Sequence, residues 1–168
     1  MTQTKRILIA VGVLLFLIIA VLGIDALRRS SSSPEPEGAA VTLEAGSVPI
    51  YVDGRMTSGF GPGDQEQLEE VSFVDAEEGK TQEGWLLRDV LLLHVAEENL
   101  KADTLITVSS SSRTKSVQLT WAEVNDTANM VMFDLSGRGT LKLVSLLERL
   151  DIRDEWVQDV DKIEVLNR

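Results

Sequence analysis

The stretch GWLLRDVLLLHVAEENL, residues 84–100, contains the best helix candidate of this sequence. From Trp85 onward its apolar residues recur at helical spacing on one face, and its charged residues fall elsewhere. Gly84 is expected to end the strand before it, and short strands dominate the sequence on both sides. One main helix among many short strands with short links predicts an α+β domain with a mixed or antiparallel β-sheet. The apolar face comprises Leu86, Leu87, Val90, Leu91, His94 and Val95.

Short runs rich in β-branched and aromatic residues predict the strands around this helix. Residues 58–64, SGFGPGD, have the composition of a loop. The run TWAE from Thr120 to Glu123 matches a capping box, which predicts a short helical turn. One or two further helical turns are expected within residues 147–158. The predicted strands are residues 41–43, 48–52, 71–74, 80–83, 105–109, 117–121, 130–135, 140–144 and 160–166.

The composition is that of a folded protein with a strongly acidic surface. The chain has 168 residues, of which 43% are hydrophobic and 26% are charged, and its formal net charge is −11. Residues 41–168 carry 24 acidic against 12 basic residues. Such a surface repels phosphate backbones, so nucleic acid is not an expected partner. The absence of cysteine excludes disulfides, thiolate zinc sites, iron–sulfur clusters and a cysteine nucleophile.

Residues 7–24, ILIAVGVLLFLIIAVLGI, contain no charged or strongly polar side chain. As a helix this run would be about 27 Å long, which is close to the thickness of the hydrocarbon core of a bilayer. It is longer than the apolar core of a usual signal peptide, and no clean cleavage site follows it. We therefore expect a single uncleaved transmembrane helix, preceded by a short tail, residues 1–6, with the lipid bilayer as its partner.

Basic residues flank the apolar run on both sides, with Lys5 and Arg6 before it and Arg28 and Arg29 after it. The amino terminus adds a positive charge to the tail, and the positive-inside rule then favours a cytoplasmic N-terminus. Residues 25–40 include SSSSPEPEG, which has the composition of an extended, solvated linker. The sequence predicts a single-pass protein of the cell membrane whose domain, residues 41–168, lies outside the cytoplasm.

The residues that could suggest a catalytic or metal site are better explained as parts of the fold. His94, the only histidine, follows three leucines on the apolar side of the helix, where a packed side chain is favoured over a metal ligand or a triad member. Residues 151–161, DIRDEWVQDVD, lack the spacing of a calcium loop, and Trp156 within them is expected to cover the core. No catalytic set and no metal site emerge, which favours a protein that is not an enzyme.

Two turns combine small residues with cations. In SGRGTLKLV, residues 136–144, the spacing of a phosphate-binding loop is missing and a strand follows where a helix should begin. A hairpin loop with glycine at positive φ is therefore predicted. Residues 109–115, SSSSRTK, place hydroxyls, backbone N–H groups and two cations at a hairpin tip. This tip could bind an anion, although a solvated turn that protects a sheet edge is favoured.

Six segments follow one another in a characteristic order: VSFV from Val71, GWLLRDVL from Gly84, ITVSS from Ile106, VQLT from Val117 with Glu123, GTLKLV from Gly139, and WVQDVDKIEV from Trp156. This order resembles the molybdopterin-binding domain of the sulfite oxidase family, above all its minimal, single-domain bacterial members. In that family a Gly-x-x-Leu-x-Asp-Val-Leu stretch opens a helix beneath the sheet, and a Trp-x-x-x-Val-x-x-Ile-x-Val strand ends the domain. The resemblance covers roughly residues 41–167 and implies the same fold.

The differences from this family concern function. Its active members bind molybdenum through a cysteine, which this chain lacks. Its Gly-Pro-Leu-Arg-Leu-Val segment has Thr140 in place of proline here and Lys142 in place of arginine. Sulfite oxidase activity is therefore not expected, no cofactor is predicted, and molybdopterin is implied by the resemblance alone. The loops that resemble cofactor-facing segments supply the candidate binding residues Ser109, Ser110, Arg113, Arg138 and Lys142.

Three hypotheses of function follow from the sequence. The first is a membrane-anchored, extracytoplasmic, non-catalytic module that binds a ligand or a partner protein on a molybdopterin-domain-like scaffold. The second is an enzyme associated with oxidoreduction that binds a pterin or another phosphorylated cofactor without a cysteine ligand. The third is a structural accessory subunit of a membrane redox complex.

Overall fold

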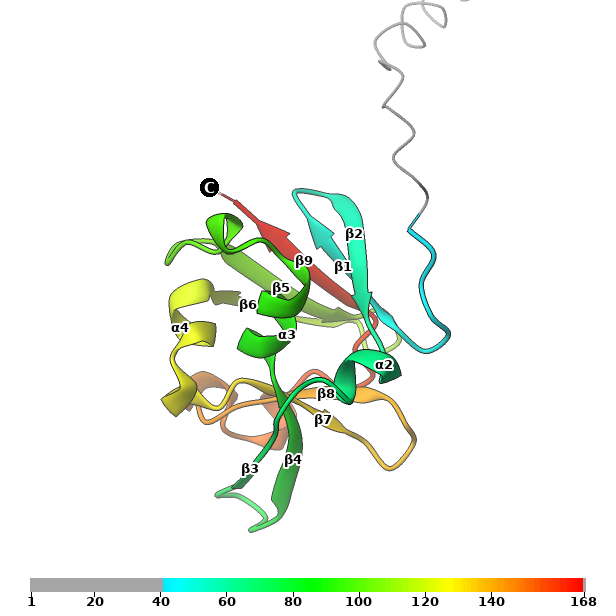
Figure 1. Ribbon diagram of the computed structural model, residues 1–168. Helices are drawn as coiled ribbons and strands as arrows, with labels where there is room; N and C mark the ends of the chain where they lie inside the picture. The colour runs from blue at the N-terminus through cyan, green and yellow to red at the C-terminus, as the bar shows by residue number, and fades with distance from the viewer. Residues whose placement is uncertain (1–40, 168) are drawn as a thin grey trace, which may run out of the picture. The chain divides into compact units, whose positions relative to one another are not determined.

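The computed structural model describes residues 41–167, which belong to one compact unit, Val41–Arg168. This unit is an α+β domain with two β-sheets and few helices, so the predicted fold class is confirmed (Figure 1). The predicted tail, transmembrane helix and linker, residues 1–40, lie outside the described residues. Within residues 41–167 every helix is too short or too polar to cross a bilayer.

A five-stranded sheet forms one layer of the domain, in the strand order β2-β1-β9-β5-β6. Strand β1 runs parallel to β9, and the other neighbours pair antiparallel. The sheet is therefore mixed, because the last strand of the chain is inserted between an N-terminal hairpin and a central hairpin. Its strands are β1 Val48–Val52, β2 Arg55–Phe60, β5 Leu105–Ser110, β6 Lys115–Thr120 and β9 Lys162–Leu166.

A four-stranded antiparallel sheet forms the second layer, in the order β3-β4-β7-β8. The outer edge of β8 is covered by the C-terminal part of the chain, since Leu143 N–H donates to Val157 O at 2.9 Å and Val160 N–H donates to Leu141 O at 2.9 Å. These bonds place residues 157–160 beside β8. The strands are β3 Glu70–Val74, β4 Thr81–Leu86, β7 Met132–Leu135 and β8 Leu141–Val144.

The main hydrophobic core contains the helix α3, Leu87–His94, which contacts strands of both sheets (Figure 1). Three fully buried side chains of α3 project into this core, and removing such apolar surface from water is the main favourable contribution to folding. Phe133 of β7 stacks on Phe60 of β2 with ring centroids 6.0 Å apart, which joins the two sheets. Core residues from α3 and from strands of the two sheets include Leu87, Val90, Leu91, Ile50, Ile163, Phe133 and Leu143.

The remaining helices are short, and two of them, α2 and α4, follow strands β2 and β6 directly. The predicted capping box is confirmed at α4, since Thr120 Oγ1 accepts from Glu123 N–H at 3.3 Å and Glu123 Oε2 accepts from Thr120 N–H at 2.8 Å. The helical turns expected within residues 147–158 are also present as two 3₁₀ turns. These elements are α2 Pro62–Gln65, α4 Trp121–Asn125 and 3₁₀ turns at Glu97–Asn99, Thr127–Asn129, Glu148–Leu150 and Arg153–Glu155.

The main helix is shorter than the sequence predicts, and its first predicted turn belongs to strand β4. Gly84 lies inside β4 rather than at its end. The position requires glycine, because a Cβ there would be 1.8 Å from Phe133 O of the neighbouring strand. Leu86 ends the strand and points away from the main core. At the other end, Val95 is extended and a separate 3₁₀ turn follows. Helical periodicity continued through both junctions, so the pattern alone could not mark them.

Two predictions about the N-terminal part of the domain are wrong. Residues 41–43 form no strand, and residues 58–60, predicted to be loop, belong to the edge strand β2. This strand is polar and largely exposed over its first half, so it lacks the apolar alternation of a half-buried strand. Gly59 lies in it with Leu43 beside it, where a Cβ would be 2.7 Å from Leu43 Cδ2.

A second, smaller apolar cluster lies on the face of the four-stranded sheet away from the main core. Leu86, Met132 and Val144 are register partners on β4, β7 and β8, so their side chains form one row on that face. Trp156 covers this row with a side chain only 5% exposed, and its Nε1–H donates to Leu150 O at 2.9 Å. The next row on the same face, at Asp134 and Lys142, is polar and leads to the candidate site.

Candidate functional site

A cleft of about 490 Å³ opens where the β3–β4 turn, the β7–β8 loop and residues 153–158 meet, and it is called the first cleft below. Because β4 and β7 are antiparallel neighbours, the start of β4 and the end of β7 lie at the same end of the sheet. The loops at that end form two walls of the cleft, and Trp156 belongs to a third. Basic side chains from all three segments line it: Lys80, Arg138, Lys142 and Arg153.

Lys142 lies in the least exposed part of this lining and is held by three groups. Its Nζ is 2.9 Å from Asp134 Oδ2, the cross-strand partner on β7, and it donates to Gln82 Oε1 at 2.7 Å. It also lies 4.9 Å from the centroid of the Trp156 ring, within the range of a cation–π contact. The side chains of Lys142 and Asp134 are 17% and 13% exposed, so this ion pair is screened less than a surface pair.

Asp75 orients Gln82 and thereby the acceptor that holds Lys142. Its buried carboxylate accepts from Glu78 N–H at 2.6 Å and from Gln82 Nε2–H at 2.9 Å. The backbone hydrogen bond from Glu78 is the main cause that lowers the pKa of Asp75 below its ordinary value, against the effect of burial, and the bond from Gln82 lowers it further. With its amide nitrogen bound to Asp75, Gln82 presents its oxygen to Lys142.

Glu78 on the β3–β4 turn is shared between two cations of the first cleft. Its Oε2 accepts from Lys80 Nζ at 2.6 Å, and its Oε1 accepts from Arg153 Nη1 at 3.1 Å. The hydrogen bond from Lys80 is the largest cause of the lowered pKa of Glu78, followed by the positive charge of Lys80. Hydrogen bonds and charge both favour the ionised carboxylate, so Glu78 is an anion at neutral pH.

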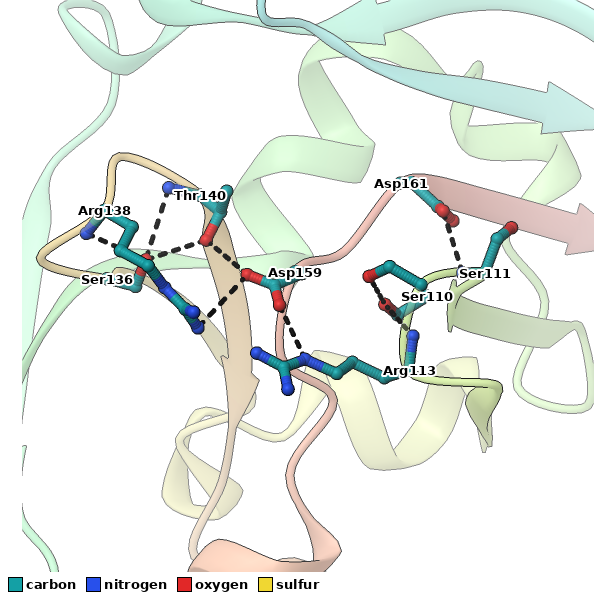
Figure 2. A network of polar contacts seen from close by, with 9 residues as sticks. Ser110, Ser111, Arg113, Ser136, Arg138, Thr140, Asp159 and Asp161 are labelled. Atoms are coloured by element: carbon teal, nitrogen blue, oxygen red, sulfur yellow. Dashed lines mark hydrogen bonds and ion pairs between the residues drawn. The ribbon is translucent and has the colours of Figure 1, made fainter.

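Asp159 is shared in the same way between the two loops that carry the sequence-predicted cations (Figure 2). Its Oδ2 accepts from Arg113 Nε at 2.6 Å, its Oδ1 accepts from Thr140 Oγ1 at 2.8 Å, and Arg138 Nη2 lies 3.6 Å from Oδ1. The hydrogen bond from Thr140 is the main cause that lowers the pKa of Asp159, followed by that from Arg113. Figure 2 shows both guanidinium groups pointing toward this carboxylate.

The loop around Arg138 is a hairpin turn that closes on itself. Gly139 has a φ of 77°, and its N–H donates to Ser136 O at 2.8 Å. The hydroxyls of Ser136 and Thr140 are 2.7 Å apart across the loop (Figure 2). Strand β8 follows directly, so the predicted hairpin loop with a glycine at positive φ is confirmed, and the arrangement differs from a phosphate-binding loop.

A second cleft of about 240 Å³ adjoins the first, because both are lined by Arg153, Trp156 and Gln158. Arg113 and Lys115 from the β5–β6 turn add two further cations to it, together with Asp154. Lys115 Nζ donates to the backbone oxygen of Asp154, which ties this turn to the 3₁₀ turn opposite. The two clefts therefore form a continuous stretch of basic lining on an acidic domain.

The five predicted binding residues lie in three places: the first cleft, the second cleft and the end of strand β5. Arg138 and Lys142 line the first cleft, and Arg113 lines the second. Ser110 is buried, and its hydroxyl lies 3.2 Å from that of Ser112 and accepts from Arg113 N–H at 3.3 Å, so it stabilises the turn. Ser109 lies within β5, where its backbone oxygen accepts from Asp161 N–H at 3.0 Å.

Sequence reasoning missed four residues that complete the lining and its charge pattern. They come from segments that no local pattern connects: the β3–β4 turn and the turns before β9. Lys142 contacts Gln82 at the start of β4, and Arg153 contacts Glu78 on the β3–β4 turn, across 60 and 75 positions of the chain. An excess of cations in two short turns, residues 109–115 and 136–140, of a strongly acidic domain was the one available signal. The missed residues are Lys80, Gln82, Glu78 and Arg153.

His94 lies at the end of α3, away from both clefts. Its Nε2 is 3.3 Å from Asp64 Oδ2, but the geometry is not that of a hydrogen bond, and the side chain is 12% exposed. The pair attracts only when the histidine is protonated. This position agrees with the packed helix histidine that the sequence favours.

The described residues do not fit the molybdenum cofactor that the family resemblance implies. No cysteine is available as the metal ligand, and within residues 41–167 no group of three or more histidine or acidic side chains could hold a metal ion. An accessible aromatic face could stack on the flat ring of a pterin. Trp156, the aromatic residue lining both clefts, is buried, and Lys142 lies over its ring.

Comparison of the chain with protein-family models, with curated proteins and with solved structures finds no match. The resemblance to the sulfite oxidase family therefore stays a prediction from the order of short motifs. The functional proposal below depends on the geometry and charge of the clefts.

Proposed function

We propose that this protein is a membrane-anchored, non-catalytic binding module whose domain lies outside the cytoplasm and binds a hydrophilic anion in the first cleft. The membrane anchor and its orientation rest on the apolar run of residues 7–24 and the charges that flank it. The binding function rests on the first cleft and its lining.

One observation carries the proposal, namely the inversion of charge around the clefts. Residues 41–168 contain twice as many acidic as basic residues, 24 against 12. The two clefts reverse this ratio, because their lining has three acidic residues, Glu78, Asp134 and Asp154, and twice as many cations. A local positive potential on a negative surface attracts anions selectively. The cations are Lys80, Arg113, Lys115, Arg138, Lys142 and Arg153.

The lining also indicates a ligand that is polar over most of its surface. Beside the charged residues it presents hydroxyl and amide groups from Thr81, Ser136 and Gln158, and Leu135 is its one exposed large apolar side chain among the described residues. A volume of about 490 Å³ lies within the usual range of small-molecule sites. We therefore assign the first cleft to a small hydrophilic anion.

Thermal unfolding of the full-length protein in detergent micelles tests this function. Citrate, inorganic phosphate and succinate are added at a fixed ionic strength, with sodium chloride as the reference. A ligand that binds the folded state stabilises it, by about 2.7 kcal/mol at 100 times its dissociation constant. We expect at least one of these anions to raise the melting temperature by several degrees over chloride.

Matched variants show whether the effect belongs to the first cleft. The double substitution Arg138→Gln with Arg153→Gln removes two cations whose side chains are 65% and 54% exposed, so it should leave the fold intact. It should abolish the stabilisation by anions. Lys101→Gln, at an exposed position outside both clefts, should retain it. No stabilisation of the parent protein, or equal loss in Lys101→Gln, would contradict the proposal.

Metal analysis and pterin fluorescence on the same preparation test the alternative of a cofactor-dependent enzyme. A non-catalytic module should contain neither molybdenum nor pterin in stoichiometric amount. Stoichiometric recovery of either group would replace the proposed function by the enzyme hypothesis.

A further inference from the structure

The wall of the first cleft at the β3–β4 turn has more positive charge than its carboxylate neutralises. Glu78 alone pairs with both Lys80 and Arg153, at 2.6 Å and 3.1 Å. Glu77 lies outside the lining and accepts from the backbone N–H of Arg153 at 3.0 Å, not from its guanidinium. This wall therefore carries a formal excess of one positive charge within the cleft.

The wall at the β7–β8 loop repeats this arrangement with other residues. Asp159 pairs with Arg113 at 2.6 Å and with Arg138 at 3.6 Å, so one carboxylate again meets two cations (Figure 2). Arg138 lines the first cleft, and Arg113 lines the second. The longer distance to Arg138, together with its 65% exposed side chain, leaves this guanidinium available to a ligand.

The part of the lining between these walls is neutral. Lys142 and Asp134 form a pair at 2.9 Å, and their formal charges cancel. In the second cleft, the formal charges of Lys115 and Asp154 also cancel, although Lys115 contacts the backbone oxygen of Asp154 and not its carboxylate. The excess positive charge is therefore divided into two separate centres, one at Glu78 with its two cations and one at Asp159 with its two cations.

From this division we infer that the ligand of the first cleft is a diacid, a small hydrophilic molecule with one anionic group for Arg138 and another for Lys80 and Arg153. This inference rests on the proposed function and specifies its ligand class. A monoanion would satisfy one centre and leave the other unpaired. A diacid joins the two contacts in one molecule, so binding of the first group raises the effective concentration of the second.

Both anionic groups are expected to be oxyacids, because guanidinium groups pair best with the planar, two-oxygen edge of a carboxylate or with a phosphate. Carboxylate and phosphate diacids share this chemistry, and the experiment includes both. The hydroxyl and amide groups of the lining provide further partners for a polar link between the two ends.

Isothermal titration calorimetry on the full-length protein in detergent tests this inference by measuring the affinity for diacids and monoacids. The carboxylate series compares malonate, succinate, glutarate and adipate with acetate, propionate and butyrate at constant ionic strength. The phosphate series compares pyrophosphate with inorganic phosphate. We expect at least one diacid to bind about tenfold or more tightly than the matching monoacid, since linked contacts gain affinity in this way.

Single substitutions then test which residues bind the two anionic groups of the diacid. Arg138→Gln and Arg153→Gln should each reduce the affinity for the preferred diacid to that of the monoacid, and should leave the protein folded by circular dichroism. Lys101→Gln should bind the diacid as the parent protein does.

The possible outcomes separate this inference from the proposed function. Equal affinity for monoacids and diacids would overturn the diacid inference and leave the anion-binding function in place. Diacid binding that is unaffected by either arginine substitution would also overturn it. Absence of binding for every tested anion would contradict the proposed function and the inference together.

Discussion

At the level of single residues, Gly84 determines how closely two strands of the four-stranded sheet approach each other. The backbone oxygen of Phe133 occupies the space where a side chain at position 84 would begin. The side chain of Phe133 lies in the main core, and the next residue, Asp134, pairs with Lys142 in the cleft. Gly84 therefore affects the position of Phe133 in the core and of Asp134 in the cleft.

Gly84→Ala is predicted to destabilise the domain by about 3 kcal/mol, because the added Cβ meets backbone atoms that cannot turn away. Urea unfolding of the full-length protein in detergent, followed by tryptophan fluorescence, measures the change. Gly137→Ala is the matched control, since nothing lies within 4 Å of its new Cβ and its φ is not positive. Equal stability of the two variants would show that β4 and β7 separate without cost.

Asp159 is predicted to make the stability of the domain depend on pH. Hydrogen bonds from Thr140 and Arg113 lower its pKa in the folded state relative to the unfolded chain. The ionised form therefore stabilises the fold above a pH of about 4, and this contribution is lost as the pH falls through the lowered pKa.

We expect Asp159→Asn to lower the melting temperature at pH 5–7, with the difference from the parent protein shrinking below about pH 4. Asparagine can still accept from Thr140, so the substitution mainly removes charge. Thermal unfolding between pH 2.5 and 7 measures the effect, with Asp103→Asn at an exposed position outside the clefts as the charge control. A difference that does not vary with pH would rule out the charge of Asp159 as its cause.

At the level of elements, the short helices and turns are specified locally, whereas the boundaries of the main helix are not. The α4 capping box lies within four consecutive residues and is recognisable from the sequence. The junction between β4 and α3 depends on a hydrogen bond from Leu87 N–H to Val131 O at 2.9 Å, across 44 positions of the chain. Apolar periodicity cannot indicate such a partner.

Thr120→Val is predicted to reduce the free energy of unfolding by about 1 kcal/mol, the usual cost of a lost N-cap. The methyl group of valine replaces the hydroxyl that accepts from Glu123 N–H. Thr120→Ser keeps the acceptor and should cost less than half as much. Denaturant unfolding of both variants measures the difference, and the same loss in both would show that the hydroxyl acceptor of Thr120 does not set the stability of α4.

The β-hairpins also determine the charge pattern of the site. The loops β5–β6 and β7–β8 come from different sheets, yet Asp159 contacts an arginine from each (Figure 2). This carboxylate lies in the connection between the four-stranded sheet and the last strand. A change in the register of β9 would therefore alter both arginines at once.

At the level of the whole molecule, the apolar N-terminal run and the basic residues that flank it predict on which side of the membrane the domain lies. The positive-inside rule predicts that residues 41–168 lie outside the cytoplasm. Protease added to intact cells should therefore digest the domain while a cytoplasmic marker protein stays protected. Permeabilised cells provide the control in which both are digested. A domain that is protected in intact cells would reverse the predicted orientation.

The sequence by itself determined the α+β class, the acidic surface, the hairpin around Arg138 and the capping box at Thr120. Each follows from composition or from contacts within a few residues, which local patterns record. Only the tertiary structure decided the polar edge strand β2, the end of β4 at Leu86 and the clefts. Those depend on partners far apart in the chain: Lys142 meets Gln82 because β4, β7 and β8 pair in one sheet, and Arg153 meets Glu78 because the turn at residues 153–155 folds beside the β3–β4 turn. The physical reason is that a cation's environment is set by the charges that the fold brings near it, and patterns within a few residues of the cation do not record those distant partners.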